Sequence, residues 1–210
     1  MLREIRNNYQ KHKLEEVDLP GDPIALFNLW LNEAIQGQVN EPTAMILATS
    51  AHNIPDTRVV LLKEIDDGNF LFYTNYDSAK AKQIASNSQV ALNFFWPELE
   101  RQVRVKGLIS KVHANLSNEY FNTRPRESQL GAWASAQSET LTGREELEQK
   151  YKLLEKQYEG TIIPKPAFWG GYQVTPYEIE FWQGRPSRLH DRIRYYRIPK
   201  HNWEFKRLSP

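Results

Sequence analysis

The chain has 210 residues, of which 40% are hydrophobic and 25% charged, and this composition suits one globular domain with a substantial core. Its 27 Lys and Arg residues nearly balance 26 Asp and Glu. That balance argues against a general nucleic-acid binder, which needs a marked basic excess, and leaves room for a local basic pocket. The lack of cysteine excludes disulfides, thiolate metal sites and cysteine nucleophiles.

The first twenty residues are polar and show no apolar period. We therefore expect residues 1–20 to form an N-terminal arm, either mobile or docked on a partner, and residues 21–210 to form a single domain. The arm has no apolar core of the signal-peptide type, and no segment approaches the roughly 18 apolar residues of a membrane span. These features predict a cytoplasmic protein with no membrane partner.

A helix is predicted to begin at Pro23 with Asp22 as its N-cap, and to end at Gly37. Strand-like segments rich in β-branched and aromatic residues follow it. The Asp67-Gly68 pair marks a turn between the second and third of them. The segments span residues 43–50, 57–65, 69–75, 89–96 and 100–112.

Helical patterns interrupt and follow these strands. One short helix is predicted at 78–86, and two or three more at 114–158, where Thr142 and Glu145 form a T-x-x-E capping box. The chain then returns to strands in FWGGYQVT, EIEFWQG, RLHDRIRYYRI and WEFKRL. Six or more antiparallel strands with helices packed outside predict an α+β barrel.

The segment FLFYTNYDSAKAKQ leads from a strand to a helix whose N-cap is Ser78. Free backbone N–H groups at that end attract anions, and Lys80 and Lys82 add positive charge. Tyr73 and Thr74 supply hydroxyls nearby. This pattern favours a phosphate site, and a capped surface helix with solvated lysines is the alternative.

The strand RVVLLK carries Arg58 and Lys63 around four apolar residues. The two ends lie roughly 16 Å apart, far enough to bracket an elongated ligand. Strict alternation puts the two side chains on opposite faces, so sharing one ligand requires a bulge, a strand end or a second subunit. Two strand ends reaching into water is the alternative. On the strand ERQVRVKG, Gln102 either bonds a polar heteroaromatic ring or belongs to a half-buried sheet face.

The stretch YFNTRPRESQLGAWASAQS combines hydroxyl and guanidinium side chains, which suit phosphate recognition: Tyr120, Arg124, Arg126, Ser128 and Ser138. Charge at helix ends is the alternative.

The segment EFWQGRPSRLHDRIRY holds the densest group of candidate residues. Trp182 offers a stacking face, and Arg188 and His190 are two residues apart, on one face of a strand that Arg192 continues. Such charges are costly in a dry core without an anion, which favours an anionic ligand. A solvent-facing sheet with Asp191 balancing the charge is the alternative.

The sequence lacks the motifs of several common catalytic and binding sites. It has no HExxH, no Cys/His metal spacing, no G-x-S-x-G elbow, no Walker A loop and no GxGxxG. We therefore expect no metal site. Anion sites and aromatic residues without a nucleophile point to a bound cofactor that performs the reaction.

The order and spacing of these motifs resemble the pyridoxine/pyridoxamine 5′-phosphate oxidase family over nearly the whole chain. The matching segments are RVVLLK, FYTNYDSAKAKQI, LERQVRVKG, YFNTRPRESQLGAWASAQS, FWGGYQV and IEFWQGRPSRLHDRIRY. The resemblance implies an antiparallel split β-barrel with surrounding helices that binds FMN. It also implies a homodimer with FMN at the subunit interface, in which two chains share each site.

The resemblance assigns roles position by position. The implied FMN contacts are Arg58, Val59, Val60, Leu61, Leu62, Lys63, Tyr73, Thr74, Lys80, Gln102, Gln137, Ser138, Trp182 and Arg192. The implied substrate contacts are Arg6, Tyr9, Lys63, Tyr120, Arg124, Ser128, Arg188, Leu189 and His190, with Arg188 and His190 in the catalytic role and Arg6 and Tyr9 closing over the substrate. One departure is Ala79, where many relatives have arginine. A lost charge-assisted hydrogen bond to phosphate is worth roughly 1.5–3 kcal/mol.

The reaction implied by the family is hydride transfer from C4′ of pyridoxamine or pyridoxine 5′-phosphate to flavin N5. It yields pyridoxal 5′-phosphate, and dioxygen reoxidises the flavin to give hydrogen peroxide. A split-barrel flavin reductase with another substrate and a non-catalytic carrier of FMN or pyridoxal phosphate are the alternatives. The substrate set separates them, because a flavin carrier needs none of Tyr120, Arg124, Ser128, Arg188 and His190.

Overall fold

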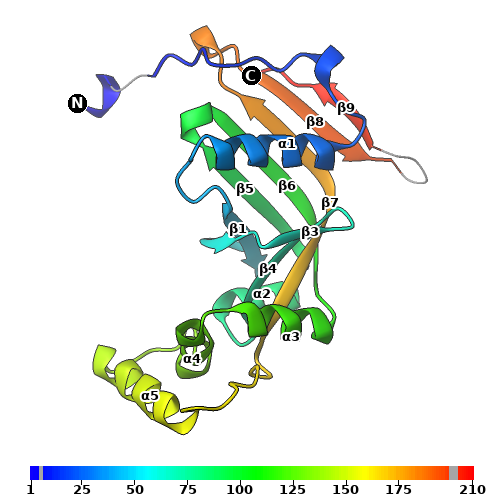
Figure 1. The fold of residues 1–210 in the computed structure, drawn as a ribbon. Helices are drawn as coiled ribbons and strands as arrows, with labels where there is room; N and C mark the ends of the chain where they lie inside the picture. Colours follow the sequence, from blue (N-terminus) through cyan, green and yellow to red (C-terminus); the bar gives the residue numbers. More distant parts are fainter. Residues whose placement is uncertain (5–6, 199–202) are drawn as a thin grey trace.

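The strands of the protein form one antiparallel sheet. The structure is a computed structural model, which describes residues 1–4, 7–198 and 203–210. Their order is β2-β1-β5-β6-β7-β4-β3, and β8 and β9 extend the sheet from the C-terminal half of β7 (Figure 1). The strands are β1 (Ala44–Ala51), β2 (Ile54–Leu61), β3 (Glu64–Asp66), β4 (Asn69–Asn75), β5 (Gln89–Trp96), β6 (Arg101–Lys111), β7 (Trp169–Gln183), β8 (Asp191–Arg197) and β9 (Trp203–Arg207).

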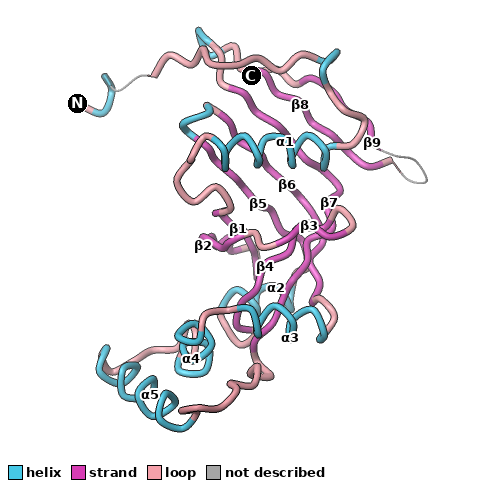
Figure 2. The backbone as a smooth tube through the Cα atoms, viewed as in Figure 1, coloured by secondary structure: helices cyan, strands magenta, loops and turns pink. Residues whose placement is uncertain are grey.

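Helices and short 3₁₀ turns lie outside the sheet, as Figure 2 shows. The α+β class and the antiparallel architecture predicted from the sequence are confirmed. The helices are α1 (Pro23–Gln36), α2 (Ala79–Ser86), α3 (Ala114–Thr123), α4 (Arg126–Ala134) and α5 (Arg144–Gln157), and the turns are η1 (Leu2–Glu4), η2 (Glu16–Asp18), η3 (Pro97–Leu99) and η4 (Pro186–Arg188). No helix within the described ranges combines the length and apolar character needed to cross a membrane.

The sheet closes on itself where the chain passes from β2 to β3. Leu62 N–H donates to the Thr43 carbonyl at 2.9 Å, which extends the pairing of β2 with β1. Lys63 N–H donates to the Leu71 carbonyl at 2.9 Å, which begins the pairing of β3 with β4. The single strand predicted at 57–65 is therefore wrong, because the chain changes partners within it. Leu62 and Lys63 thus connect β2 and β3, the first and last strands in the sheet order, and the sheet closes into a barrel.

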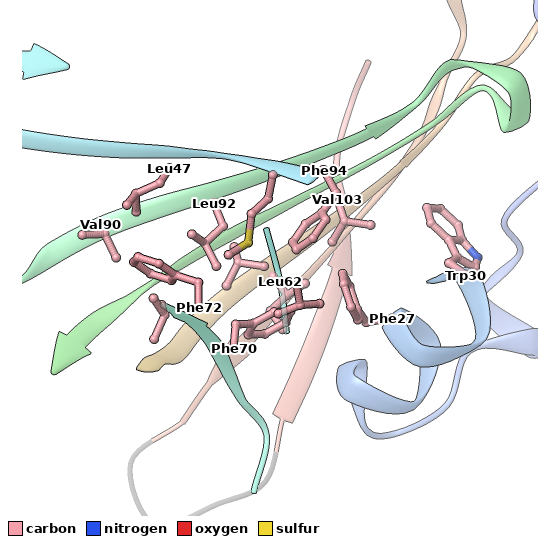
Figure 3. Close-up of a cluster of buried hydrophobic side chains, with 14 of the residues drawn as sticks. Phe27, Trp30, Leu47, Leu62, Phe70, Phe72, Val90, Leu92, Phe94 and Val103 are labelled. Carbon is pink, nitrogen blue, oxygen red and sulfur yellow. The ribbon is translucent and has the colours of Figure 1, made fainter. Parts of the chain in front are cut away.

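The core fills the barrel beneath α1. Asp22 accepts a hydrogen bond from Ile24 N–H and the helix ends at Gly37, as predicted. The ring of Phe27 lies 4.9 Å, between centroids, from both Phe70 and Phe94 (Figure 3). Helix α1 therefore covers one open face of the barrel with aromatic side chains.

Two other predicted elements differ in the structure. The segments FWGGYQVT and EIEFWQG form one long strand, β7, which pairs with β4 at its start and with β8 at its end. The capping box is shifted by one residue, because Gly143 is the N-cap of α5. Glu146 rather than Glu145 therefore occupies the third helical position, and its carboxylate accepts from Thr142 N–H at 3.2 Å.

The N-terminal segment lies along the β8 side of the sheet (Figure 1). Leu14 is buried, and its N–H donates to the carboxylate of Asp191, where β8 begins. The Arg207 guanidinium on β9 binds both Glu16 and Asp191, at 2.5–2.7 Å. These contacts hold residues 14–16 against β8 and β9 of their own chain, not against a partner.

Candidate functional site

A cavity of about 660 Å³ lies between the β2–β3 crossing, β4, and helices α3 and α4. It brings together most of the residues to which the sequence assigns phosphate or flavin contacts. These are Val59, Val60, Leu61, Lys63, Tyr73, Thr74, Lys80, Tyr120, Arg124, Ser128 and Gln137. The site thus gathers residues that lie nearly eighty positions apart in sequence.

The β2–β3 crossing places Lys63 in this cavity. Because β2 ends at Leu61, the alternation of side chains between the two faces of that strand does not extend to Lys63, which lines the cavity. Arg58, still within β2, does not join it. Its guanidinium donates to Thr49 Oγ1 at 2.6 Å and to the Asp56 carboxylate at 2.6 Å. Of the two charges in RVVLLK, the structure brings only Lys63 to the cavity wall.

Lys80 is the buried cation of the first cavity. Its Nζ donates to Thr74 Oγ1 and Ser78 Oγ at 3.0 Å each, and to Gln137 Oε1 at 2.7 Å. Ser78 is the N-cap residue of α2, but its hydroxyl donates to the Asn75 carbonyl instead of capping the helix. Burial, with a smaller contribution from the Arg58 charge, lowers the pKa of Lys80 to about 8. All three acceptors are neutral, so an anion is the partner that this ammonium lacks.

A stack of aromatic rings forms one wall of the cavity. The rings of Tyr73 and Tyr120 stack with centroids 3.9 Å apart, and Tyr73 stacks on Trp169 at 5.6 Å. The guanidinium of Arg124 lies 4.6 Å from the centroid of the Trp169 ring. These contacts hold Arg124 against a flat apolar surface.

Arg124 has an unsatisfied donor. Among the described residues, its Nη1 is buried without any hydrogen-bond partner. Burial also lowers the pKa of Arg124 from its usual value. A buried guanidinium N–H that lacks an acceptor costs free energy, and a bound anion would remove that cost.

A second cavity, of about 610 Å³, is lined by Asn7, Asn8, Tyr9, Arg185, Ser187, Arg188 and His190. Arg188 and His190 meet here, but not on a strand. Pro186 starts the η4 turn, Ser187 and Arg188 have φ of 56° and 61°, and β8 begins only at Asp191. The predicted strand face is therefore wrong, and a left-handed turn presents the two side chains instead.

The imidazole of His190 is held by the backbone of the same turn. Its Nδ1 accepts a hydrogen bond from Arg185 N–H at 3.0 Å. In the neutral ring the proton then lies on Nε2. Burial, followed by the Arg188 charge, lowers the pKa of His190, while Asp191 opposes that change. His190 can thus donate one hydrogen bond to a ligand through Nε2.

Three further predicted residues form a row across the sheet. Gln102 on β6 pairs with Trp182 on β7, and Trp182 pairs with Arg192 on β8. The ring of Trp182 lies 4.7 Å from that of His190, so the row adjoins the second cavity. Arg192 already donates to the Glu180 carboxylate at 2.9 Å.

Some predicted residues line neither cavity. Leu62 is buried in the core, and Ser138 and Leu189 are exposed next to lining residues. Arg6 lies outside the described residues. Sequence reasoning missed Trp169 and Arg185, although both stand inside the motifs FWGGYQV and WQGRPSR.

Within the described ranges, the two cavities share no lining residue. Figure 1 places α3 and α4, beside the first cavity, at the opposite end of the sheet from residues 185–190. One chain therefore presents two separate groups of cavity residues, called half-sites below, one with Lys63, Lys80 and Arg124, and the other with Arg188 and His190. Whether they belong to one site is a matter for the proposed function.

Comparisons with known proteins show the family of this chain. Residues 31–158 match the family model described as pyridoxamine 5′-phosphate oxidase, and residues 169–210 match the pyridoxine 5′-phosphate oxidase C-terminal dimerisation region. Proteins named pyridoxine/pyridoxamine 5′-phosphate oxidase from Actinobacillus succinogenes and a Cyanothece species are 53% and 48% identical to this chain. The alignments cover 100% of this chain and 99% and 98% of theirs.

A solved structure extends the comparison. PhzG from Burkholderia lata, in complex with tetrahydrophenazine-1-carboxylic acid, superposes with a TM-score of 0.90 and 29% identity, covering 97% of this chain and 100% of that one. An FMN-binding protein from Nostoc punctiforme, related to pyridoxamine 5′-phosphate oxidase, has the same fold, with a TM-score of 0.72 at 16% identity. Family models, full-length relatives and fold all agree, and the chain belongs to the pyridoxine/pyridoxamine 5′-phosphate oxidase family.

Proposed function

We propose that this protein oxidises pyridoxamine 5′-phosphate or pyridoxine 5′-phosphate to pyridoxal 5′-phosphate with FMN as cofactor and dioxygen as electron acceptor. The observation that carries the proposal is the buried Arg124 Nη1 without a hydrogen-bond partner, in the cavity that Lys63, Tyr120 and Ser128 also line. A phosphate group supplies the acceptor oxygens and the negative charge that this arrangement needs. The cytoplasmic location stays a prediction.

The residues of the first cavity fit FMN. Lys80 has no anionic partner among the residues that the structure describes, and Thr74 Oγ1 and Gln137 lie within hydrogen-bond distance of it. These groups suit the flavin phosphate, while the exposed apolar side chains of Val59 and Leu61 offer a surface for the ring. With no arginine at position 79, Lys80 carries a larger share of the phosphate contact. When bound, FMN accepts a hydride from the substrate and passes the electrons to dioxygen.

The protein's own residues place the substrate. Lys63, Tyr120, Arg124 and Ser128 hold its phosphate, and the stacked wall beside them excludes water from one side. Arg188 and His190 orient the reacting end, the imidazole donating from Nε2 because Nδ1 is already occupied. Arg192 and Gln102, in the row beside Trp182, complete the proposed cofactor contacts.

The homodimer is the form in which these half-sites meet. The C-terminal match to a dimerisation region supports two copies of the chain. We propose that the first cavity of one copy faces Arg188 and His190 of the other, with FMN between them. The outer face of the sheet supplies apolar surface for such contact, since Val59 and Phe95 are 64% and 52% exposed.

One experiment tests the reaction. The purified protein is loaded with FMN and incubated in air with pyridoxamine 5′-phosphate, and pyridoxal 5′-phosphate and hydrogen peroxide are measured. We expect both products in equal amounts. Bound flavin without either product would contradict the proposal, and would favour a flavin carrier or a reductase acting on another substrate.

A further inference from the structure

Glu100 is a buried carboxylate whose partners belong to the N-terminal segment. It is 8% exposed and stands between η3 and β6, with a left-handed φ of 56°. Its Oε2 accepts from the backbone N–H groups of Gln10 at 2.9 Å and Lys11 at 3.0 Å. Two consecutive amides directed at one carboxylate oxygen form a charge-assisted anchor for this segment.

The residue next to this anchor is Tyr9, which lines the second cavity. Its ring meets Trp182 edge-on, with centroids 5.7 Å apart and planes at 88°, and lies 5.8 Å from the ring of His190. Tyr9 therefore forms a wall of the cavity that holds Arg188 and His190.

Gly184 leaves the space that Tyr9 fills. A Cβ at position 184 would lie 2.7 Å from Tyr9 Cγ, closer than such atoms approach, and 3.0 Å from Glu100 Cβ, a tight contact. Gly184 N–H also donates to the Glu100 carbonyl at 2.7 Å. Glu100 thus holds the end of β7 with its backbone and the N-terminal segment with its side chain.

From this geometry we propose that Glu100 is a positioning residue, which fixes Tyr9 against His190 and Trp182 and so sets the shape of the Arg188–His190 cavity. The functional part of this inference rests on the proposed oxidase reaction. A segment without this anchor samples other positions, and the cavity then holds its ligand in a wider range of orientations. Glu100 itself needs no contact with substrate or flavin.

Hydrogen exchange tests the anchor without reference to activity. Glu100→Ala is compared with Glu98→Ala, a matched control two residues away on the exposed surface. We expect amide exchange at Gln10 and Lys11 to accelerate about tenfold or more in Glu100→Ala, because each amide loses a hydrogen bond to a charged group. The Glu98→Ala protein keeps wild-type rates. Unchanged exchange at both amides in Glu100→Ala would overturn the anchor, whether or not the protein is an oxidase.

A double-mutant cycle tests the route through Tyr9. Tyr9→Ala, Glu100→Ala and the double variant are compared for kcat, KM and FMN content with pyridoxamine 5′-phosphate. We expect Glu100→Ala to lower kcat/KM by about tenfold at unchanged FMN content, and the double variant to be no slower than Tyr9→Ala. Additive losses in the double variant would overturn the route, because Glu100 would then act independently of Tyr9.

A second variant covers the case in which Glu100→Ala does not fold. Gly184→Ala places a Cβ against the Tyr9 ring while leaving the Glu100 carboxylate in the chain. We expect it to lower kcat/KM when Tyr9 is present and to have no further effect in a Tyr9→Ala background. An equal loss in both backgrounds would overturn the inference. A wild-type protein with no oxidase activity at all would instead refute the proposed function. The hydrogen-exchange experiment would still test whether Glu100 anchors Gln10 and Lys11.

Discussion

At the scale of single residues, Lys80 is a cavity lysine whose pKa is lowered toward neutrality. Its pKa is lowered by burial to about 8, against a usual value of 10.5. Without a ligand, the buried charge therefore costs stability below about pH 8, and this cost is relieved as pH rises toward 10.5. A phosphate bound beside Lys80 stabilises the ammonium and raises its pKa, so binding above pH 8 takes up a proton.

The affinity for FMN should follow this titration. We expect the dissociation constant to be constant from about pH 7 to 8, and then to rise by up to about tenfold per pH unit until the pKa of the complex is reached. Quenching of flavin fluorescence in titrations from neutral to alkaline pH measures it. Lys80→Arg should bind FMN without the slope, because a guanidinium stays charged throughout. A slope that persists in Lys80→Arg would show that another group titrates.

At the scale of elements, the turn at 185–190 presents the side chains proposed to act on the substrate. Ser187 and Arg188 are consecutive non-glycine residues with φ of 56° and 61°. Each such residue costs of order 1–3 kcal/mol and persists only where its surroundings hold it in place. Arg185 supplies part of that support, with its N–H on His190 Nδ1 and its guanidinium 3.0 Å from Asp191.

Substitutions at Ser187 should separate the effect of the turn on the placement of Arg188 from its effect on folding. A β-branched residue is disfavoured in the left-handed region, whereas asparagine tolerates it. We expect Ser187→Val to lower kcat/KM by about tenfold, the equivalent of ~1.4 kcal/mol of strain, and Ser187→Asn to stay within about twofold of wild type. FMN content should be alike in both, and the Tm of Ser187→Val should fall by only the few degrees that ~1.4 kcal/mol of strain costs. Equal activity of the two variants would mean that the turn conformation does not place Arg188.

Elements with local signals could be predicted from the sequence, and elements set by distant partners could not. Helix α1 follows from Asp22, Pro23 and Gly37, which all act within one turn of its ends. The break between β2 and β3 has no local signal, because the run of residues through Leu62 and Lys63 suits a continuous strand. It exists because the carbonyls of Thr43, directly before β1, and of Leu71, on β4, each accept one backbone N–H there.

The candidate site shows the same limit. The residues expected to bind phosphate around Lys80 and Arg124 were predicted from residue type and motif. The wall formed by Trp169 and the support from Arg185 were missed, since neither residue type signals a ligand by itself. The turn that presents Arg188 and His190 was read as a strand, because alternating charged and apolar residues follow it. Pro186 was the local sign of a turn.

At the scale of the whole molecule, the proposed active site requires two chains. Arg124 and Arg188 line different cavities, so in our proposal each active site takes one of them from each copy. Figure 1 shows α3 and α4, beside the first cavity, at the opposite end of the sheet from the 185–190 turn. A dimer related by two-fold symmetry then holds two equivalent sites. Arg124→Ala and Arg188→Ala should each inactivate the homodimer, the first through substrate phosphate binding and the second through orientation of the reacting end.

Mixing the two inactive variants should restore activity. In a hybrid dimer, one site carries both substitutions and the other carries neither, because the intact Arg124 and the intact Arg188 lie on different chains. Unfolding and refolding an equal mixture makes half of the dimers hybrids, so we expect about one quarter of wild-type activity. Refolding either variant alone is the control. If both arginines of a site came from one chain, each site of the hybrid would carry one substitution and no activity would return.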